Sequence, residues 1–305
     1  MISNFTSLFD LLDAFPDEQA CLDHLREIRW GDGEFCPYCG GTRIYHFSDR
    51  KNFKCGDCRA RFSIKVGTIF GDTKLPLRKW YMAIWMITNH PKGIASTTLA
   101  KDLKITQKSA WFVLHRLRHA ARTKSFNAPL KGTTEIDETY VGGKEKNKHA
   151  SKRRPGSQGG AGKEIVLGII ERDGELRTGV VDDMKAKTVK RIIAENVEKG
   201  STIMTDEHGA FIGLGDDGYW HHAVNHSAGE YVRHQTIHTN SIESVWALLK
   251  RQIVGIHHWV SPKHLPRYVD EMTWRFNRRD MATPARMNDI FACVEGRLTY
   301  KALIG

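Results

Sequence analysis

Two Cys-x-x-Cys pairs constrain the fold of this chain more than any other feature. Cys36 and Cys39 form one pair, Cys55 and Cys58 form the other, and roughly 15 residues separate the pairs. Four thiolates with this spacing are typical of one tetrahedral Zn²⁺ site. A thioredoxin-type redox pair is disfavoured because there are two pairs and no surrounding strand–helix–strand pattern. We therefore predict a structural zinc ribbon over residues 30–72, with a small sheet between the pairs.

The charge of the chain indicates a polyanionic partner. The formal net charge is +11 and the pI is about 9.4, which is unusually basic for a metabolic enzyme. The predicted ribbon is itself basic, and phosphate contact or a simply solvated face would both explain this. No apolar run reaches the roughly 18 residues that a membrane span needs, and residues 1–16 lack the pattern of a signal peptide. We expect a cytoplasmic protein that does not bind membranes.

Helical patterns precede and follow the ribbon. Residues 1–29 read as a helical lead-in, in which Cys21 lies on an apolar stripe and is expected to be a packing residue. Residues 73–125 read as a helix-turn-helix domain, with a short helix over 96–103, a turn over 104–106 and a longer helix from 107, for which Thr106 is the expected N-cap. An ordinary helical hairpin is the alternative.

The longer helix would present polar side chains to DNA. Gln107, Lys108 and Ser109 stand at its amino-terminal end, where the second helix of a helix-turn-helix contacts base edges. Arg116 lies further along the same helix and is also a candidate DNA contact. The sequence therefore predicts a DNA-binding surface on this domain.

Residues 130–290 have the pattern of an α/β domain. Strands are predicted over 133–143, 164–171, 176–181 and 202–206, with a helix over 188–197 before the last of them and a helix over 238–251 after it. This succession is the plan of a ribonuclease-H-like mixed sheet with helices packed against it. Residues 219–238 read as an irregular, His-rich stretch, and residues 291–305 as a carboxy-terminal tail.

A basic segment interrupts the predicted sheet. Residues 144–163 are rich in Lys, Arg, Gly and Ser and nearly free of apolar residues, so this segment cannot bury a core. We expect a mobile basic loop, in which Lys152, Arg153 and Arg154 are candidate DNA contacts.

Three acids fall on three elements of the predicted domain that would converge. Asp137 is in the first strand, Asp206 ends the fourth, and Glu243 is in the first turn of the following helix. The first and fourth strands are neighbours in a ribonuclease-H-like sheet. Carboxylates suit Mg²⁺ or Mn²⁺, and two such ions can support an in-line phosphodiester displacement. Taken alone, the last helix is more simply interpreted as an amphipathic helix with a solvated charged face. Glu138 is expected to point to the opposite strand face from Asp137.

The sequence resembles the bacterial insertion-sequence DDE transposases that carry an amino-terminal zinc ribbon. The resemblance covers roughly residues 30–280. The matching stretches are Trp30 through Cys58, Gly67-Thr68-Ile69-Phe70, Ile136 through Gly143, Thr205-Asp206, Val224-Asn225-His226-Ser227 and His238 through Arg251.

The resemblance implies roles for individual residues. Asp137, Asp206 and Glu243 would be the metal ligands, with Asn240 as an alternative to Glu243. Lys250, seven residues after Glu243, would be the family's basic residue and would contact DNA together with its neighbour Arg251. The implied reaction is cleavage at transposon ends by water, followed by attack of the freed 3′-hydroxyl on target DNA. The resemblance further implies a homo-oligomer assembled on double-stranded DNA and a location at the bacterial nucleoid.

Two other functions remain open on the sequence. One is a non-catalytic DNA-binding regulator whose catalytic fold is inactive, and the other is a ribonuclease-H-like nuclease acting on RNA or hybrids. A second zinc site is a further possibility, because five histidines lie close together in sequence: His221, His222, His226, His234 and His238. No ligand pair among them has a firm metal-site spacing.

Overall fold

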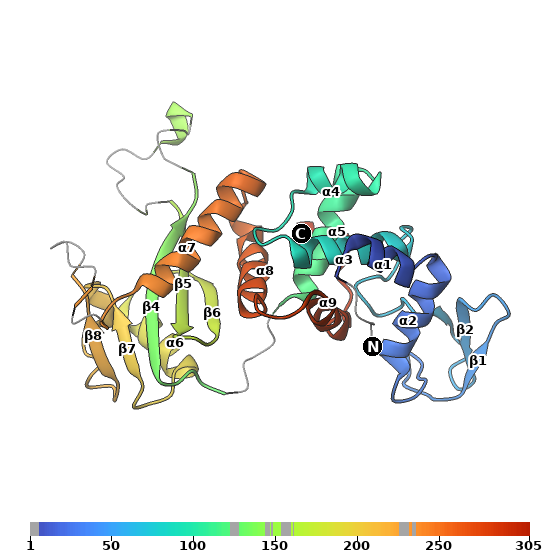
Figure 1. The fold of residues 1–305 in the computed structure, drawn as a ribbon, viewed down its shortest axis with the longest axis horizontal. Coiled ribbons are helices and arrows are strands. Elements are labelled where there is room, and N and C mark those ends of the chain that lie inside the picture. The colour runs from blue at the N-terminus through green and yellow to red at the C-terminus, as the bar shows by residue number, and fades with distance from the viewer. Residues whose placement is uncertain are drawn as a thin grey trace. The chain divides into compact units, whose positions relative to one another are not determined.

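Two stretches of the chain that are far apart in sequence build the amino-terminal unit (Figure 1). In this computed structural model, residues 1–121 group with 280–305, and residues 122–279 form a second unit. The structure describes residues 6–122, 128–143, 147, 149–153, 160, 162–225, 232–233 and 236–305. At Lys152 it describes only the backbone.

The amino-terminal unit combines the ribbon with a set of helices. The ribbon is an antiparallel sheet in the order β1-β2-β3, in which Phe53 pairs with His46 on one side and Phe62 on the other. The elements of this unit are α1 (Leu8–Ala14), α2 (Glu18–Trp30), β1 (Ile44–His46), β2 (Asn52–Cys55), β3 (Arg61–Ser63), α3 (Leu77–Asn89), α4 (Ser96–Leu103), α5 (Gln107–Ala120), α9 (Thr283–Ala292) and α10 (Tyr300–Ile304).

The predicted helix, turn and helix form at α4 and α5. Lys104 ends α4 in the left-handed region at φ 49°, which reverses the chain at once. The Thr106 side chain then accepts a hydrogen bond from the backbone N–H of Ser109 and caps α5. The residues that the sequence predicted for the turn and the cap therefore have those roles.

The carboxy-terminal segment returns to the amino-terminal unit. The backbone of Ile69 donates to Val294, and Gly296 donates to Gly67. The Arg29 guanidinium forms an ion pair with Glu295, at 2.7 Å between Nε and Oε1. The sequence interpretation assigned residues up to 290 to the α/β domain, whereas the structure groups residues 280–305 with the first unit. These contacts join residues more than 200 positions apart, which no local pattern reports.

The second unit contains a five-stranded sheet in the order β6-β5-β4-β7-β8. β5 pairs antiparallel to both β4 and β6, while β7 pairs parallel to β4 and β8 pairs parallel to β7. This is the predicted ribonuclease-H-like mixed sheet. Its elements are β4 (Thr133–Val141), β5 (Glu164–Glu171), β6 (Leu176–Val181), α6 (Ala186–Asn196), β7 (Thr202–Thr205), β8 (Trp220–Ala223), α7 (Asn240–Gln252) and α8 (Leu265–Asn277). β8 lies within the stretch that the sequence analysis treated as irregular.

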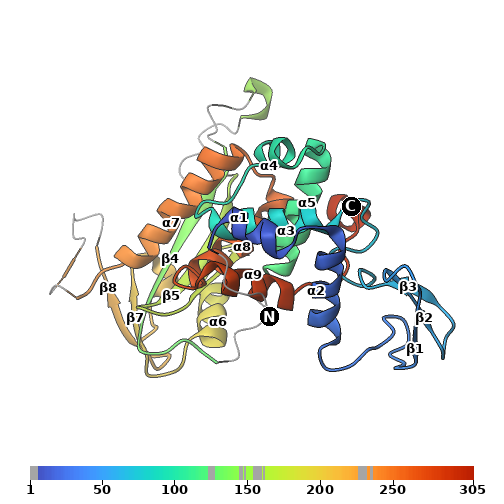
Figure 2. The same cartoon turned by 45° about the vertical axis from the view of Figure 1, so that its right-hand side comes forward.

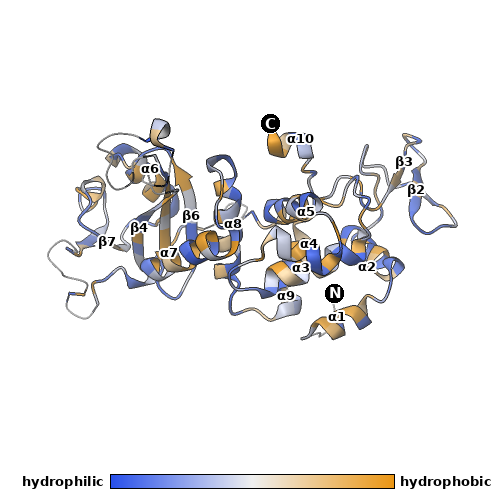
Figure 3. Ribbon diagram, turned by 90° about the horizontal axis from the view of Figure 1, so that it is seen from above, coloured by the Kyte–Doolittle hydropathy of each residue, from blue (hydrophilic) through white to orange (hydrophobic). Residues whose placement is uncertain are grey.

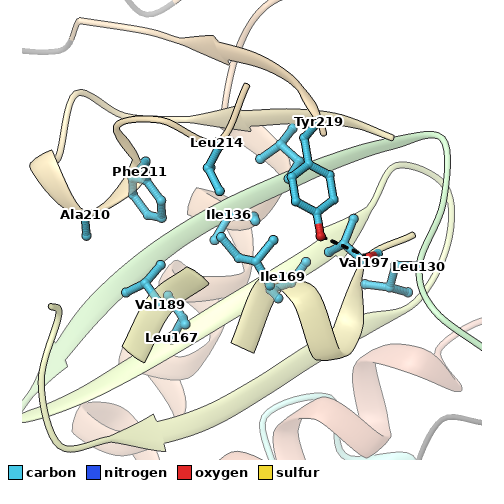
Figure 4. Close-up of a cluster of buried hydrophobic side chains, with 12 residues drawn as sticks. Leu130, Ile136, Leu167, Ile169, Val189, Val197, Ala210, Phe211, Leu214 and Tyr219 are labelled. Carbon is cyan, nitrogen blue, oxygen red and sulfur yellow. Dashed lines mark hydrogen bonds between the residues drawn. The ribbon is translucent and has the colours of Figure 1, made fainter. Parts of the chain in front are cut away.

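Helices cover each face of the sheet, with α6 on one face and α7 on the other (Figure 2). Neighbouring residues on a strand therefore enter different cores. Ile136, Leu167 and Ile169 pack with α6 and the turn around Phe211, and the Tyr219 hydroxyl donates to the Val197 carbonyl at the edge of this cluster (Figure 4). On the other face, Val166 and Ile170 pack with α7 and α8.

α7 has one apolar side. Ile242, Val245, Trp246 and Leu249 are buried, and hydrophobic and hydrophilic residues alternate along the helix (Figure 3). Among the described residues, the structure contains no helix with both the length and the apolar character that crossing a bilayer requires.

His24 should make the amino-terminal unit lose stability in acid. Its ring packs against Phe15, Tyr81 and Phe291, and burial lowers its pKa from 6.5 to about 4. The folded state favours the neutral ring, so its contribution is present above about pH 6.5 and is lost as the pH falls through about 4.

The Nδ1 atom of His24 is hydrogen-bonded to the Tyr81 hydroxyl at 2.7 Å, a bond that an asparagine amide can also make. We expect His24→Asn to reduce the acid-dependent loss of stability by up to roughly 3 kcal/mol. Thermal unfolding followed by circular dichroism between pH 4 and 6.5 checks it. Superimposable pH curves for the two proteins would contradict the expectation.

Candidate metal centres and active site

The four cysteines of the ribbon lie close enough to share one metal ion. All four sulfurs are within 4.8 Å of one another. The Sγ atoms of Cys36 and Cys58 are 3.7 Å apart, and those of Cys39 and Cys55 are 3.6 Å apart. Sulfurs bound at about 2.3 Å to a tetrahedral Zn²⁺ stand roughly 3.8 Å from one another. The cluster therefore has the dimensions of a zinc site.

Tight turns bring each cysteine pair together. After Cys39, Gly40 adopts φ +75°, and after Cys58 the corresponding residue, Arg59, adopts φ +62°. In the first turn, Gly40 donates its backbone N–H to the Cys36 carbonyl. In the second, the N–H of Asp57 donates to the Cys55 sulfur at 3.3 Å. An N–H group that donates to the sulfur, as that of Asp57 does, favours the thiolate form of the cysteine, and the thiolate is the form that binds metal.

Three carboxylates form a second cluster at the edge where β7 ends. Asp137, Glu138 and Asp206 each offer an oxygen within 4.8 Å of the others. β4 pairs with β7 as far as Glu135 and Met204, and continues beyond the end of β7. Asp206 follows β7 directly and so lies beside the free part of β4. Its Oδ1 accepts the backbone N–H of His208, which orients the carboxylate.

The acids of the cluster raise one another's pKa values. Burial, then the charges of Glu138 and Asp206, raise the pKa of Asp137 to about 7. Burial, then the charge of Asp206, raise the pKa of Glu138 to about 7. The Oε2 atom of Glu138 is buried and has no hydrogen-bond partner within the part of the chain that the structure describes. Carboxylates held together in this way are suited to bind a divalent cation.

A tryptophan from α7 holds one oxygen of Asp137. The Trp246 Nε1–H donates to Asp137 Oδ2 at 2.9 Å. The indole lies over Gly168, which pairs with Asp137 across β4 and β5. A Cβ at residue 168 would be 2.6 Å from the ring, so only glycine leaves room for Trp246 there. The indole bond therefore orients the carboxylate of Asp137 through one of its two oxygens.

Glu243 is not part of this three-acid cluster. It lies in the first turn of α7, is exposed, and accepts a hydrogen bond from the Thr239 hydroxyl at 3.1 Å. Asn240 is exposed at the start of the same helix, and Lys250 and Arg251 are exposed in its last turn. The roles of Glu243 and Asn240 as metal ligands therefore stay predictions.

The family of the chain follows from two sequence matches. Residues 129–277 match the ISXO2-like transposase domain, and residues 16–61 match the transposase zinc-ribbon domain. The chain belongs to the family of insertion-sequence transposases that carry an amino-terminal zinc ribbon.

Individual relatives agree with this placement. The transposase is 28% identical over 273 residues to an uncharacterized protein in transposable element ISH50 of Halobacterium salinarum, covering 85% of this chain and 90% of that protein. It is 29% identical over 104 residues to an uncharacterized transposase-like protein of Haemophilus influenzae, covering 34% of this chain and 82% of that protein.

A solved structure of the Mos1 strand transfer complex also shows some likeness to this transposase. It covers 67% of this chain and 75% of that chain, at 13% identity. Its TM-score is 0.29, which is too low to support any conclusion.

The candidate DNA contacts of the transposase differ in exposure. Gln107 and Lys108 are exposed at the start of α5, and Ser109 is half-buried. Arg153 is exposed. The side chain of Lys152 and the whole of Arg154 lie outside the described residues.

Arg116 was misassigned as a DNA contact. It is only 4% exposed, and its guanidinium donates to the backbone carbonyls of Leu298, Ile69 and Gly71. It therefore ties the returning carboxy-terminal segment to the body of the first unit. Its position on the buried side of α5 depends on where that segment packs, which the sequence of α5 alone cannot reveal.

Glu138 belongs to the acid cluster, although strand alternation predicted that it would point away from Asp137. Strand alternation turns its side chain away from the face of Asp137, but near the free edge of β4 a long side chain can still reach Asp206. The signal was present as two consecutive acids in one strand. Among the clustered histidines, His226 and His234 lie outside the described residues, and His221 bonds the Thr205 hydroxyl at 2.9 Å.

Zinc should be bound by the ribbon and needed for its fold. We expect a single zinc ion per chain, and we expect Cys39→Ala to lose it because three thiolates leave a tetrahedral site open. The melting temperature of the first unit should fall when the zinc ion is lost. Cys293→Ala, which lies outside the cluster, should keep the metal. Elemental analysis and thermal unfolding check both. Full zinc occupancy in Cys39→Ala would remove Cys39 from the site.

Removing one charge from the acid cluster should stabilise the metal-free protein. The folded pKa of Glu138 is raised, so its favourable contribution is present at low pH and is lost as the pH rises through about 7. At pH 8 we expect Glu138→Gln to be more stable than the wild type by about 1 kcal/mol. The exposed acid Glu198 provides a control, since Glu198→Gln should change little. Equal or lower stability of Glu138→Gln in a chelator would contradict the expected repulsion.

Proposed function

We propose that this transposase binds transposon ends, cleaves them by metal-dependent phosphodiester hydrolysis and joins the 3′-hydroxyl to target DNA. The observation that carries the proposal is the meeting of Asp137, Glu138 and Asp206 within the transposase domain. Hydrolysis of a phosphodiester needs charge stabilisation on the attacking and leaving oxygens, and a carboxylate cluster that holds divalent ions can provide it.

The donor atoms fit Mg²⁺ or Mn²⁺. Every candidate ligand is a carboxylate oxygen, which these hard cations prefer, and no cysteine or neutral histidine belongs to the described cluster. Burial and mutual repulsion raise the pKa values of Asp137 and Glu138, and Oε2 of Glu138 is buried with no hydrogen-bond partner among the described residues. A bound divalent cation would relieve this repulsion. Bound ions, two in the proposed mechanism, would activate water or the 3′-hydroxyl and neutralise the phosphate.

In this proposal the chain's own residues have distinct roles. Asp137, Glu138 and Asp206 hold the cation, and the Trp246 indole orients Asp137. Glu243 remains the ligand that the family resemblance implies, entering from the first turn of α7. Glu138 and Glu243 are thus separate candidates for completing the site, and single substitutions can distinguish them.

The proposed DNA contacts lie on both units. Gln107, Lys108 and Ser109 would bind a transposon end through the helix-turn-helix, and the basic ribbon would add phosphate contacts. Lys250 and Arg251 on α7, with residues 152–154, would hold DNA near the acids. Binding would be strongly salt-dependent, as the net charge of +11 suggests. We further propose that a homo-oligomer assembles on two ends, at the nucleoid.

Loss of a ligand should abolish cleavage without abolishing binding. We expect Asp137→Asn and Asp206→Asn to reduce cleavage at least about a hundred-fold, because a lost ligand weakens the bound cation. Glu243→Gln should do the same if it is a ligand. Binding of a duplex carrying the inverted repeat should stay within about two-fold of wild type, since these residues do not contact the end sequence. Cleavage and strand-transfer assays in Mg²⁺ and Mn²⁺, with gel-shift binding, measure both.

Each outcome decides a different part of the proposal. Wild-type cleavage in Glu243→Gln would remove Glu243 from the site, and wild-type cleavage in Glu138→Gln would remove Glu138. Specific binding with no product from the wild type would favour a DNA-binding regulator. Cuts without joining, or preferential cleavage of RNA or hybrids, would indicate a nuclease instead.

A further inference from the structure

A fourth acid near the cluster, Glu135, binds a helix. It is two residues before Asp137 on β4, is 0% exposed, and is not part of the three-acid group. Its Oε2 accepts the backbone N–H groups of Ser241 at 2.8 Å and Ile242 at 3.1 Å. Its Oε1 accepts the Ser241 hydroxyl at 3.0 Å. The carboxylate of a strand residue therefore satisfies the first turn of α7.

This contact substitutes for an ordinary helix cap. The residue at the N-cap position of α7, Thr239, makes no side-chain cap hydrogen bond. The first N–H groups of a helix need acceptors, and a negative charge is favoured at this end of the helix dipole. Glu135 meets both needs from more than 100 residues away in sequence.

An arginine balances the buried charge of Glu135. Arg172, just after β5, donates from Nε to Glu135 Oε1 at 2.8 Å. Its other nitrogens donate to the backbone carbonyls of Thr236 and His238 and contact His238 Nδ1 at 3.1 Å. In a buried site, charge-assisted hydrogen bonds stabilise the fold strongly when each donor and acceptor has a partner. Arg172 thus connects Glu135 to the segment that leads into α7.

Two parallel contacts connect β4 with α7. Glu135 and Asp137 are two apart on a strand and face the same side of the sheet. Ile242 and Trp246 are four apart on a helix and face the same side of it. Glu135 bonds the N–H of Ile242, and Asp137 accepts the indole N–H of Trp246. The first contact therefore determines where along β4 the second can form.

We propose that Glu135, held by Arg172, is a positioning residue of the metal site. It sets α7 along β4 so that Trp246 binds one oxygen of Asp137 and orients the carboxylate for the cation. The same turn of α7 carries Glu243. This inference rests on the proposed function, because it takes Asp137 as a ligand of a divalent cation.

The test measures Mn²⁺ affinity on the folded full-length chain, with isothermal titration calorimetry well below the melting temperature. Glu135→Gln keeps the shape of the side chain but places an amide N–H₂ where N–H donors now point. We expect Mn²⁺ to bind about ten-fold more weakly, the usual size for loss of an outer-shell partner. Wild-type Mn²⁺ affinity in folded Glu135→Gln would overturn the inference.

A matched variant separates positioning from stability. Arg177, on β6, is buried on the α6 side of the sheet and donates to the Asn196 carbonyl. Arg177→Met should lower the melting temperature of the same unit yet keep Mn²⁺ affinity. If Arg177→Met weakens Mn²⁺ binding as much as Glu135→Gln does, general destabilisation explains both and the inference fails.

A double-mutant cycle tests the route through Trp246. Trp246→Phe keeps the packing over Gly168 and removes only the N–H donor to Asp137. If Glu135 acts by placing Trp246, the double variant should bind Mn²⁺ about as weakly as the weaker single variant. Effects that simply multiply would show that Glu135 does not act through Trp246.

Two more variants keep the result decisive. Ser241→Ala removes only the hydroxyl bond to Glu135 and should fold, so we expect a loss of Mn²⁺ affinity of about two- to three-fold even if Glu135→Gln does not fold. Unchanged affinity in Ser241→Ala, with Glu135→Gln unfolded, would count against the inference. Asp137→Asn tests the underlying function. Unchanged Mn²⁺ affinity in Asp137→Asn would reject the metal site itself. Loss of Mn²⁺ binding in Asp137→Asn together with wild-type affinity in Glu135→Gln would reject only the positioning role of Glu135.

Discussion

The contact between β4 and α7 determines the geometry of the candidate site. β4 is the central strand: β5 pairs with it from Thr134 to Val141, and β7 pairs with it as far as Glu135. α7 packs on it through an apolar side and through the hydrogen bonds of Glu135 and Trp246. Apolar packing alone tolerates sliding of a helix along a sheet, whereas paired hydrogen bonds of defined direction do not. The polar contacts therefore specify the register that the packing stabilises.

The same strand carries acids with opposite energetic effects. Glu135 is buried with every oxygen bonded and a cation beside it, so its charge stabilises the fold. Asp137 and Glu138 are partly buried beside Asp206, and burial together with the neighbouring acids raises their pKa values, which costs stability. Proteins tolerate such a cost where the charge serves a ligand. Hydrogen bonding and charge pairing therefore distinguish Glu135, a structural carboxylate, from Asp137 and Glu138, the candidate metal ligands on the same strand.

Much of the fold was predictable because its signals are local. The cysteine spacing indicated the ribbon, the Thr106 cap and the turn before it indicated α4 and α5, and apolar patterns located β4 to β7. β8 was missed because its four residues, Trp220–Ala223, include two histidines and alternate between exposed and half-buried positions. A short edge strand is formed mainly by pairing with β7, and such pairing leaves little trace in composition.

The sequence by itself determined which residue types could do the chemistry: four thiolates for zinc, a set of acids for a hard cation, and a basic surface for DNA. Only the tertiary structure decided which of them meet. Asp137 and Asp206 converge as expected, but Glu138 joins them since β7 ends early, and Arg116 is buried because residues 280–305 return to the first unit. Residue chemistry is a property of each position, whereas proximity depends on contacts between segments distant in sequence.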